Sequence, residues 1–518
     1  MRKTFQKQHF LCLMFACLMF HAAMAQKNWT VEWGKVYEHD KKEGNIVKIL
    51  ASDAAGFYVL RSTGPLGRSA APSVIVLNPF VSKKQSAWID YYDFKFKKLK
   101  SVAIGLTYNK EELDLEDVIF FGGKLYVLTS FFNKKQEKSF LFAQQVDAAN
   151  LSISPEYAKL TEFSMTNKYR GASYDIQYSA DSSKILIHAG LVMQKADKEQ
   201  YTLSVWDKGM VKSWEKTVIL PYPENDIFVK SFRVDNNGTA YIVAGRDRSR
   251  KEKSERQEYD TDYYVFAWSK LGQVFKEYKA TLEKKYISGF NLVLLDNGDL
   301  ACAGLYSDEE EGQVKGAFFY RINPETGTVS HKNLQAFSFE VRAEDLSERK
   351  QEKARDKESQ KQKERELVAY KLDGMFVRPD GNVMVIGEQN YTTTSQSYDG
   401  KTWRTYTVFH YDDLVLANFT PEGQLLWSSL LKKKQTSFSG YLLAAINSKM
   451  HVVYKNDKKD DSVQMASVTD DGKIDYNYIT ANDEYNLDAR VCELVDANTI
   501  IIHTSTRKDH RFGKIIFK

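Results

Sequence analysis

Cysteine is scarce in this chain: only four occur among 518 residues, and two of them, Cys12 and Cys17, lie near the N-terminus. The other two, Cys302 and Cys492, fall in different copies of the repeat described below. A disulfide needs Cα atoms within about 7 Å of each other. We therefore expect two buried free thiols and no disulfide framework.

Long apolar runs are also missing after the first 25 residues, so no transmembrane segment is expected in the mature chain. The run Leu11–Phe20 is too short to span a bilayer. It follows the basic residues Arg2, Lys3 and Lys7 and precedes Ala23–Ala25, a small-x-small cleavage pattern. Residues 1–25 are predicted to be a signal peptide cleaved after Ala25, and the protein is predicted to be exported.

Cys17 follows Ala16 within the apolar run, which raises the question of a lipid-attachment box. Met14 and Phe15 fit such a box poorly, so plain cleavage is expected. An exported, Asn- and Tyr-rich chain suits a periplasmic, outer-membrane-associated or cell-surface bacterial protein. The sequence does not separate these compartments.

An excess of charge of one sign is lacking too, since 73 Lys and Arg face 68 Asp and Glu, for a net charge of +5. Removing the three positive charges of the leader leaves +2. Nucleic-acid binding needs clustered positive charge, so no nucleic-acid partner is expected.

Motifs for metals, phosphates and nucleophilic catalysis do not occur: there is no HExxH, CxxC pair, EF-hand loop, GxSxG or phosphate-binding loop. No cofactor, metal site or catalytic residue is therefore predicted. His188 and His503 occupy corresponding places in two copies of the repeat, and we interpret both as buried, hydrogen-bonded histidines.

What the chain does have is a repeat of two apolar strands joined by an Asp, Asn or Gly turn. FRVDNNGTAYIVAG, from Phe232, is the clearest copy. Asp, Asn and Gly tolerate the backbone of short hairpin turns. The second strand is almost continuously apolar, which indicates a sheet buried on both faces. Further copies begin at Lys48, Leu115, Ile176, Leu292, Met375, Leu442 and Cys492.

Two more strands follow most copies, as in LVLANFTPEGQLLWSSLL from Leu414. Repeats of four antiparallel strands resemble the blades of β-propellers, without pointing to one family. The resemblance implies an all-β fold, with residues 26–518 as one propeller domain. Eight blades are favoured. Seven is the alternative, since the copy from Leu115 to Phe163 has weak third and fourth strands.

The two ends of the chain complement each other in this scheme. The last copy ends after its third strand, near KIIFK, and Trp29–Tyr37 reads as a fourth strand without a sheet of its own. Pairing the two would close the ring and cover the last open sheet edge.

Residues 341–366 interrupt the repeat with a highly charged segment that has almost no apolar residues. Pairs such as Asp345 with Arg349 and Glu358 with Lys361 are spaced to support a helix. No apolar stripe is present to pack it. We expect a solvated helix or a disordered insertion between two blades.

Strand direction alternates within a blade, so loops between strands two and three leave the same face as the links between blades. The long segments at Gly64, Met193, Gly245, Tyr306 and Gly387 all join strands two and three. Variable loops on one face of a rigid scaffold commonly bind ligands. Flat rings and amides on this long-loop face suit a glycan or a partner protein. The candidate ligand-binding residues are Asn390, Tyr391, Gln396, Tyr398, Trp403, Tyr406, Tyr259 and Tyr263.

One short motif is similar to the Asp-box of sialidase-type propellers. It is SYDGKTW, Ser397 to Trp403, and it lacks one residue between Asp399 and Thr402. It occurs once and follows a second strand, whereas the family's motif lies between strands three and four. An Asp-Gly turn accounts for it.

The sequence thus favours an exported, non-enzymatic propeller that binds a protein or glycan of the cell envelope through its long-loop face. The alternative is a carbohydrate-active hydrolase or lyase with its site at the central channel. Its acids would be Asp53, Asp235, Asp296 or Asp380, all of which lie in predicted hairpin turns.

Overall fold

The computed structural model describes most of the chain that follows the predicted leader. The described residues are 28–38, 43–66, 85–164, 172–191, 198–247, 261–280, 282, 285–309, 312–360, 364–398, 401–436, 440–457, 462–480, 486–506 and 508–518. The predicted leader with Cys17, and the candidate residue Tyr259, lie outside these ranges. No helix among the described residues is long and apolar enough to cross a membrane.

The first four sheets follow the order of the chain, and each consists of antiparallel strands. They are β3 (Asn45–Ser52), β4 (Gly56–Ser62), β5 (Ala87–Asp93) and β6 (Lys98–Ala103); β9 (Asp114–Phe121), β10 (Lys124–Asn133) and β11 (Lys138–Asp147) with β12 (Ser152–Ile153) and β13 (Ala158–Ser164); β14 (Ala172–Tyr178), β15 (Lys184–Leu191), β16 (Lys198–Asp207) and β17 (Val211–Pro223); and β18 (Ile227–Val234), β19 (Ala240–Asp247), β20 (Thr261–Ser269) and β21 (Val274–Ala280).

The next three sheets repeat the same order. They are β22 (Tyr286–Leu294), β23 (Leu300–Ser307), β25 (Gly316–Ile322) and β26 (Val329–Ala336); β28 (Tyr370–Val377), β29 (Val383–Tyr398), β30 (Trp403–Phe419) and β31 (Leu425–Leu431), with β32 (Gln435–Thr436) paired to β30; and β33 (Tyr441–Ile446), β34 (Lys449–Asn456), β35 (Ser462–Val468) and β36 (Ile474–Thr480). Two small pairs lie outside them: β7 (Thr107–Tyr108) with β8 (Glu111–Glu112), and β24 (Gln313–Val314) with β27 (Leu367–Val368).

The last sheet contains both ends of the chain. It comprises β37 (Asn486–Leu487), β38 (Glu493–Asp496), β39 (Thr499–Ser505) and β40 (Asp509–Phe517), together with β1 (Trp29–Trp33) and β2 (Tyr37–Glu38). Strand β1 runs antiparallel to β40, with Trp29 opposite Phe517 and Trp33 opposite Gly513. The N-terminal segment therefore supplies the outer strand of the sheet that ends the chain.

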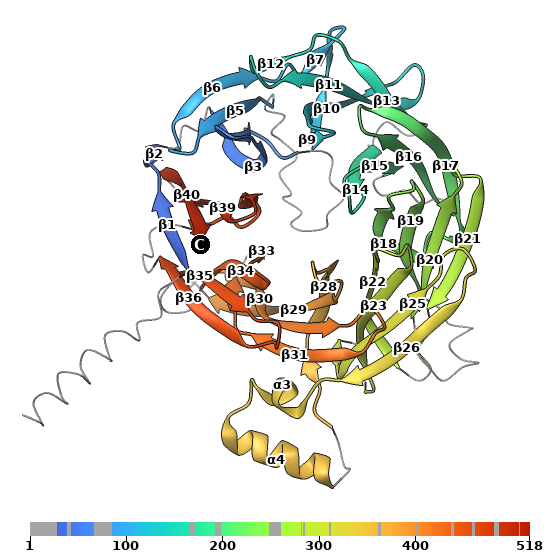
Figure 1. Ribbon diagram of the computed structural model, residues 1–518, viewed down its shortest axis with the longest axis vertical. Helices are drawn as coiled ribbons and strands as arrows, with labels where there is room; N and C mark the ends of the chain where they lie inside the picture. Colours follow the sequence, from blue (N-terminus) through green and yellow to red (C-terminus); the bar gives the residue numbers. More distant parts are fainter. Residues whose placement is uncertain are drawn as a thin grey trace, which may run out of the picture.

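Figure 1 shows these sheets following one another around a common axis. Every pair of neighbouring sheets shares a cluster of buried apolar side chains, including the pair formed by the last and the first sheet. In that last cluster Phe512 of β40 lies against Phe57 of β4, with ring centroids 5.3 Å apart. This arrangement is a β-propeller built from four-stranded antiparallel blades.

Second strands are buried on both faces, as their apolar runs predict. All seven residues of β4 and all eight of β23 are buried. The turns between first and second strands hold themselves together. The Asp235 carboxylate accepts hydrogen bonds from the backbone N–H of Asn237 (2.9 Å) and Thr239 (2.7 Å). Gly238 follows with φ of +80°, a conformation that favours glycine.

The charged segment 341–366 contains a solvated helix, one of the two predicted possibilities. Helix α3 (Phe339–Ala343) is followed by α4 (Glu348–Ser359), in which no residue is buried. Arg342, only 6% exposed, donates through Nη1 to Glu358 Oε1 at 2.7 Å. Because α4 has no apolar face, this ion pair attaches it to α3, and the pair between Arg365 and Asp345 (2.7 Å) joins the segments that precede and follow it.

The two thiols outside the predicted leader, Cys302 and Cys492, are buried and free, as predicted. Burial raises the pKa of Cys492 to about 12 and also raises that of Cys302. Buried thiols held in the protonated form are unreactive, so both act as packing residues.

Candidate functional site

The strand order places the long segments on one face of the ring. The segments at Gly64, Met193, Gly245, Tyr306 and Gly387 connect β4 to β5, β15 to β16, β19 to β20, β23 to β25 and β29 to β30, and α3 and α4 lie in the link from the fifth to the sixth sheet. Second-to-third connections and blade-to-blade links leave the same rim. The short Asp and Gly turns leave the opposite rim.

The insertion at Gly387 is not a loop, contrary to the sequence-based interpretation. Strands β29 and β30 continue past the sheet as a two-stranded ribbon, with Tyr391 opposite His410 and Tyr398 opposite Trp403. Thr, Tyr and Trp favour extended backbone, and this composition carries the pairing to the tip. Among the described residues, no third strand pairs with the ribbon beyond His410.

Tyr398 and Trp403 form an exposed aromatic pair at the end of the ribbon. Their ring centroids are 5.2 Å apart, and the residues are 55% and 68% exposed. Asn390 and Gln396 lie on the same face of the ribbon, because side chains of a strand alternate between its faces. Four of the candidate residues are therefore brought together on one surface.

Tyr406 and Tyr391 belong to the other face of the ribbon. Tyr406 lies opposite Ser395 and is 49% exposed. Tyr391 is fixed at the ribbon base, where its hydroxyl donates to Asp412 Oδ2 (3.0 Å) and its ring stacks on His410 at 4.5 Å. Burial, together with that hydrogen bond, raises the pKa of Tyr391.

Tyr263 is not a surface residue, and its prediction as a ligand-binding residue is wrong. It is 4% exposed and packs between the fourth and fifth sheets, with its ring 5.5 Å from that of Phe290. It lies in β20, where both faces of the strand meet neighbouring sheets. An aromatic residue at the start of a third strand is thus a core residue here.

The ribbon base is fixed by a buried lysine in the link that follows β31. The Lys433 side chain is fully buried. Its Nζ donates to Glu388 Oε1 (2.7 Å), the Tyr411 carbonyl oxygen (2.7 Å) and Gln435 Oε1 (2.9 Å). One ammonium group thereby bonds both ribbon strands and β32, and each of its three N–H groups has an acceptor.

Beside the ribbon base, the long-loop face is hollowed where β32 of the sixth sheet, the seventh sheet, the eighth sheet and the first sheet meet. Two adjoining cavities of about 870 and 530 Å³ lie there and share Asp488, Arg490 and Ser505. We call them together the recess. The larger is also lined by Asn45, Ile46, Val47, Ser62, Thr63, Gly64, Pro65, Leu66, His503 and Thr506, and the smaller by Gln435, Thr436, Gly440, Lys455, Asp457, Asn486, Leu487 and Ala489.

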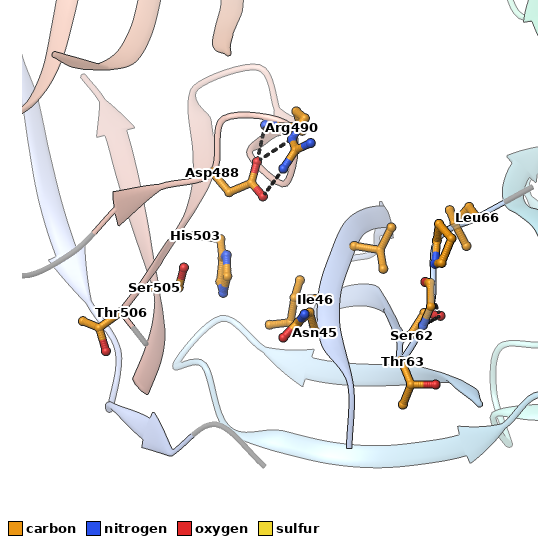
Figure 2. Close-up of a pocket in the computed structure, with 13 residues that line it drawn as sticks. Asn45, Ile46, Ser62, Thr63, Leu66, Asp488, Arg490, His503, Ser505 and Thr506 are labelled. Atoms are coloured by element: carbon orange, nitrogen blue, oxygen red, sulfur yellow. Dashed lines mark hydrogen bonds and ion pairs between the residues drawn. The ribbon is translucent and has the colours of Figure 1, made fainter. Parts of the chain in front are cut away.

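A turn between β37 and β38 divides the recess. The innermost strand of the eighth sheet is interrupted over residues 488–492, where the other sheets have a continuous strand. The backbone N–H of Asp488 donates to the His503 carbonyl oxygen (3.2 Å), and that of Val491 donates to the Asp488 carbonyl oxygen (3.0 Å). The turn places Asp488 and Arg490 over the recess, as Figure 2 shows.

Ion pairs hold the charged side chains of the recess in fixed orientations. Arg490 donates through Nε to Asp488 Oδ1 (2.9 Å) and through Nη2 to Oδ2 (3.0 Å), and these bonds raise the pKa of Arg490. In the smaller cavity Lys455 lies 3.4 Å from Asp457 Oδ1. Asp457 Oδ2 also accepts from the Thr436 N–H (2.8 Å) and hydroxyl (3.0 Å).

The acids considered for a hydrolase lie on the short-turn rim. Asp53 accepts hydrogen bonds from two backbone N–H groups and from the hydroxyls of Tyr58 and Tyr91. Asp235 and Asp380 accept bonds within their own turns, and Asp296 is exposed. Among the described residues, no group of three His, Cys, Asp or Glu is placed to hold a metal ion.

His188 and His503 both pack against aromatic rings. The His188 ring stacks on Phe232 at 3.6 Å, and its Nε2 lies 3.4 Å from Asp175. His503, 4% exposed, lies against Phe512 at 5.3 Å and forms part of the recess wall. Neither Asp488 nor Arg490 was predicted. The available signal lies in the first strand of the last repeat, where the charged residues Asp488 and Arg490 alternate with apolar ones.

No family model matches the chain, and no curated protein matches it. Solved structures align with most of the chain at low identity and low TM-score. The β-propeller domain of the Trilobed protease from Pyrococcus furiosus has 10% identity and a TM-score of 0.36, covering 86% of this chain and 98% of that one. The WD40 domain of SCAP from fission yeast has 8% identity and a TM-score of 0.37, covering 95% and 99%. A Synechocystis apocarotenoid oxygenase has 9% identity and a TM-score of 0.35, covering 86% and 91%.

Proposed function

We propose that this chain is an exported, non-catalytic binding protein and that its long-loop face engages a partner protein of the cell envelope. The Tyr398–Trp403 pair carries the proposal. A Trp that is 68% exposed at the end of a paired ribbon is hydrophobic surface that water solvates poorly. Trp, Tyr and Arg are the residues that dominate binding energy at protein interfaces, and Arg404 adjoins this pair.

Rigidity of the ribbon favours the same role. Lys433 fixes its base, and paired strands extend from there to the aromatic tip. Strand pairing along the ribbon lowers the conformational entropy that binding would cost, compared with an unpaired loop. The leader predicted at residues 1–25 supports export. The carboxylates of Asp53, Asp235 and Asp380 accept hydrogen bonds within their own turns, and the proposal includes no catalytic step.

To test the proposal, the mature chain is immobilised, and the native envelope proteins that it retains are quantified by mass spectrometry. Replacing both Tyr398 and Trp403 with serine is expected to weaken retention of a specific protein tenfold or more, because each hot-spot ring contributes more than about 1.4 kcal/mol. The control is Tyr478→Ser, which removes a ring that is 54% exposed on the outer strand β36. Equal retention by wild type and the double variant would contradict the proposal.

A further inference from the structure

We propose that the recess is a second binding site, separate from the ribbon tip, and that its ligand is a neutral oligosaccharide. Its place in the fold indicates a built site. The two cavities, about 870 and 530 Å³, fall in the size range of ligand pockets. They adjoin each other where the regular blade is interrupted by the Asp488–Arg490 turn, and together they extend from β32 of the sixth sheet to the first sheet.

The lining of the smaller cavity excludes an apolar ligand. Eight of its eleven residues carry polar side chains, and none of the eleven is aromatic. Covering these groups with hydrocarbon would remove their water without replacing its hydrogen bonds. The larger cavity adds apolar side chains at Ile46, Val47, Pro65 and Leu66 beside its polar ones. The ligand must therefore supply hydrogen-bonding groups along the smaller cavity and can place the carbon face of a sugar ring against the apolar part of the larger one.

The charges of the recess cancel in pairs, which argues against an ionic ligand. Asp488 neutralises Arg490, and Asp457 neutralises Lys455. An anion would compete with Asp488 for the guanidinium, and a cation would compete with Arg490 for the carboxylate. A neutral ligand can bind both partners without separating them.

The same ion pairs leave donors and acceptors side by side. The Arg490 Nη1 amino group is not used in its two side-chain bonds to Asp488. Asp488 Oδ1 accepts from both the backbone N–H and the Nε of Arg490, whereas Oδ2 accepts one bond and has a further lone pair. A sugar hydroxyl both donates and accepts, so neighbouring hydroxyls of one ring match this arrangement. Ser505, which both cavities share, and Asn486 and Thr436 in the smaller cavity add neutral partners of the same kind.

Binding is tested by calorimetry of the mature protein with defined hexasaccharides of glucose, mannose, galactose and N-acetylglucosamine. Hexagalacturonate serves as the anionic probe and a random hexapeptide pool as the peptide probe. At least one neutral hexasaccharide is expected to bind. Arg490→Ala removes the donor and Ser505→Trp fills the junction of the cavities. Each is expected to weaken binding tenfold or more, with thermal unfolding recorded to show that each variant folds.

Two controls separate this site from others. Arg355→Ala breaks a comparable Arg–Glu pair on α4, where Arg355 lies 3.3 Å from Glu340, and is expected to leave binding unchanged. The Tyr398→Ser/Trp403→Ser variant is also expected to bind the sugar normally, so the ribbon proposal and this one can fail independently. Binding of hexagalacturonate or peptide alone, no binding of any neutral probe, or unchanged binding by both recess variants would overturn the proposal.

Discussion

Replacing Lys433 with methionine is expected to lower the free energy of unfolding by about 3–5 kcal/mol. The Glu388 side chain that faces Lys433 is 5% exposed, so the substitution leaves a buried carboxylate without its cation. The Tyr411 carbonyl and Gln435 lose a donor as well. Burial lowers the pKa of Lys433, and the Glu388 carboxylate opposes that shift by stabilising the charged ammonium.

Denaturant unfolding of three variants measures this effect. The double variant Lys433→Met/Glu388→Met should recover most of the loss, since removing both charges of a buried pair is often nearly neutral. Lys473→Met, at an exposed lysine paired with Asp471, should leave stability unchanged. If the double variant is no more stable than Lys433→Met, the loss of stability does not come from the Glu388 carboxylate that has lost Lys433.

Acidification from pH 6.5 to pH 4 is expected to cost the fold about 3 kcal/mol through one histidine. His451 in β34 is 5% exposed, its Nδ1 lies 2.9 Å from the Ser467 hydroxyl, and its ring lies 4.5 Å from that of Phe517. Burial lowers the pKa of His451 from 6.5 to about 4. Below pH 6.5 His451 therefore binds a proton in the unfolded chain, whereas in the folded protein it does so only at about pH 4.

The loss appears at about 1.4 kcal/mol per pH unit within that window and is complete near the folded pKa. Carboxylates also titrate there, so the measurement compares wild type with His451→Gln by denaturant unfolding at pH 7, 5 and 4. The stability gap between the two proteins should shift in favour of the variant as pH falls. His331→Gln, at an exposed histidine, is the control. A gap that stays constant with pH would contradict the prediction.

Local sequence patterns predicted the blades because each blade is made of consecutive strands. The apolar run AYIVAG becomes the buried strand β19, and the Asp235 turn closes on its own backbone. Export and the leader stay predictions, since residues 1–25 lie outside the described ranges. Local charge spacing in the charged segment was also compatible with a helix, and α4 forms there. Its anchors, Arg342 with Glu358 and Arg365 with Asp345, span 16 and 20 residues and have no local spacing signal.

The candidate site was harder to predict from the sequence, because the recess is assembled from segments that are far apart in the chain. The recess brings together Asn45, Thr436, Asp457 and Arg490, which come from the first sheet, the sixth sheet, the end of the seventh and the eighth. The ribbon was misread because Asn, Thr, Ser and Gly near its turn resemble loop composition, although Thr and Tyr also favour strands. Tyr263 was assigned to the surface because it follows a long insertion, whereas it is a residue of the core.

Site-specific photocross-linking in native cells tests most directly whether the long-loop face is the binding face. A benzophenone amino acid is placed at Trp403 on the ribbon tip or at Asn237 in an exposed turn of the opposite rim. The account predicts a discrete cross-linked protein from position 403 and none from position 237. A cross-link from position 237, with none from position 403, would contradict it.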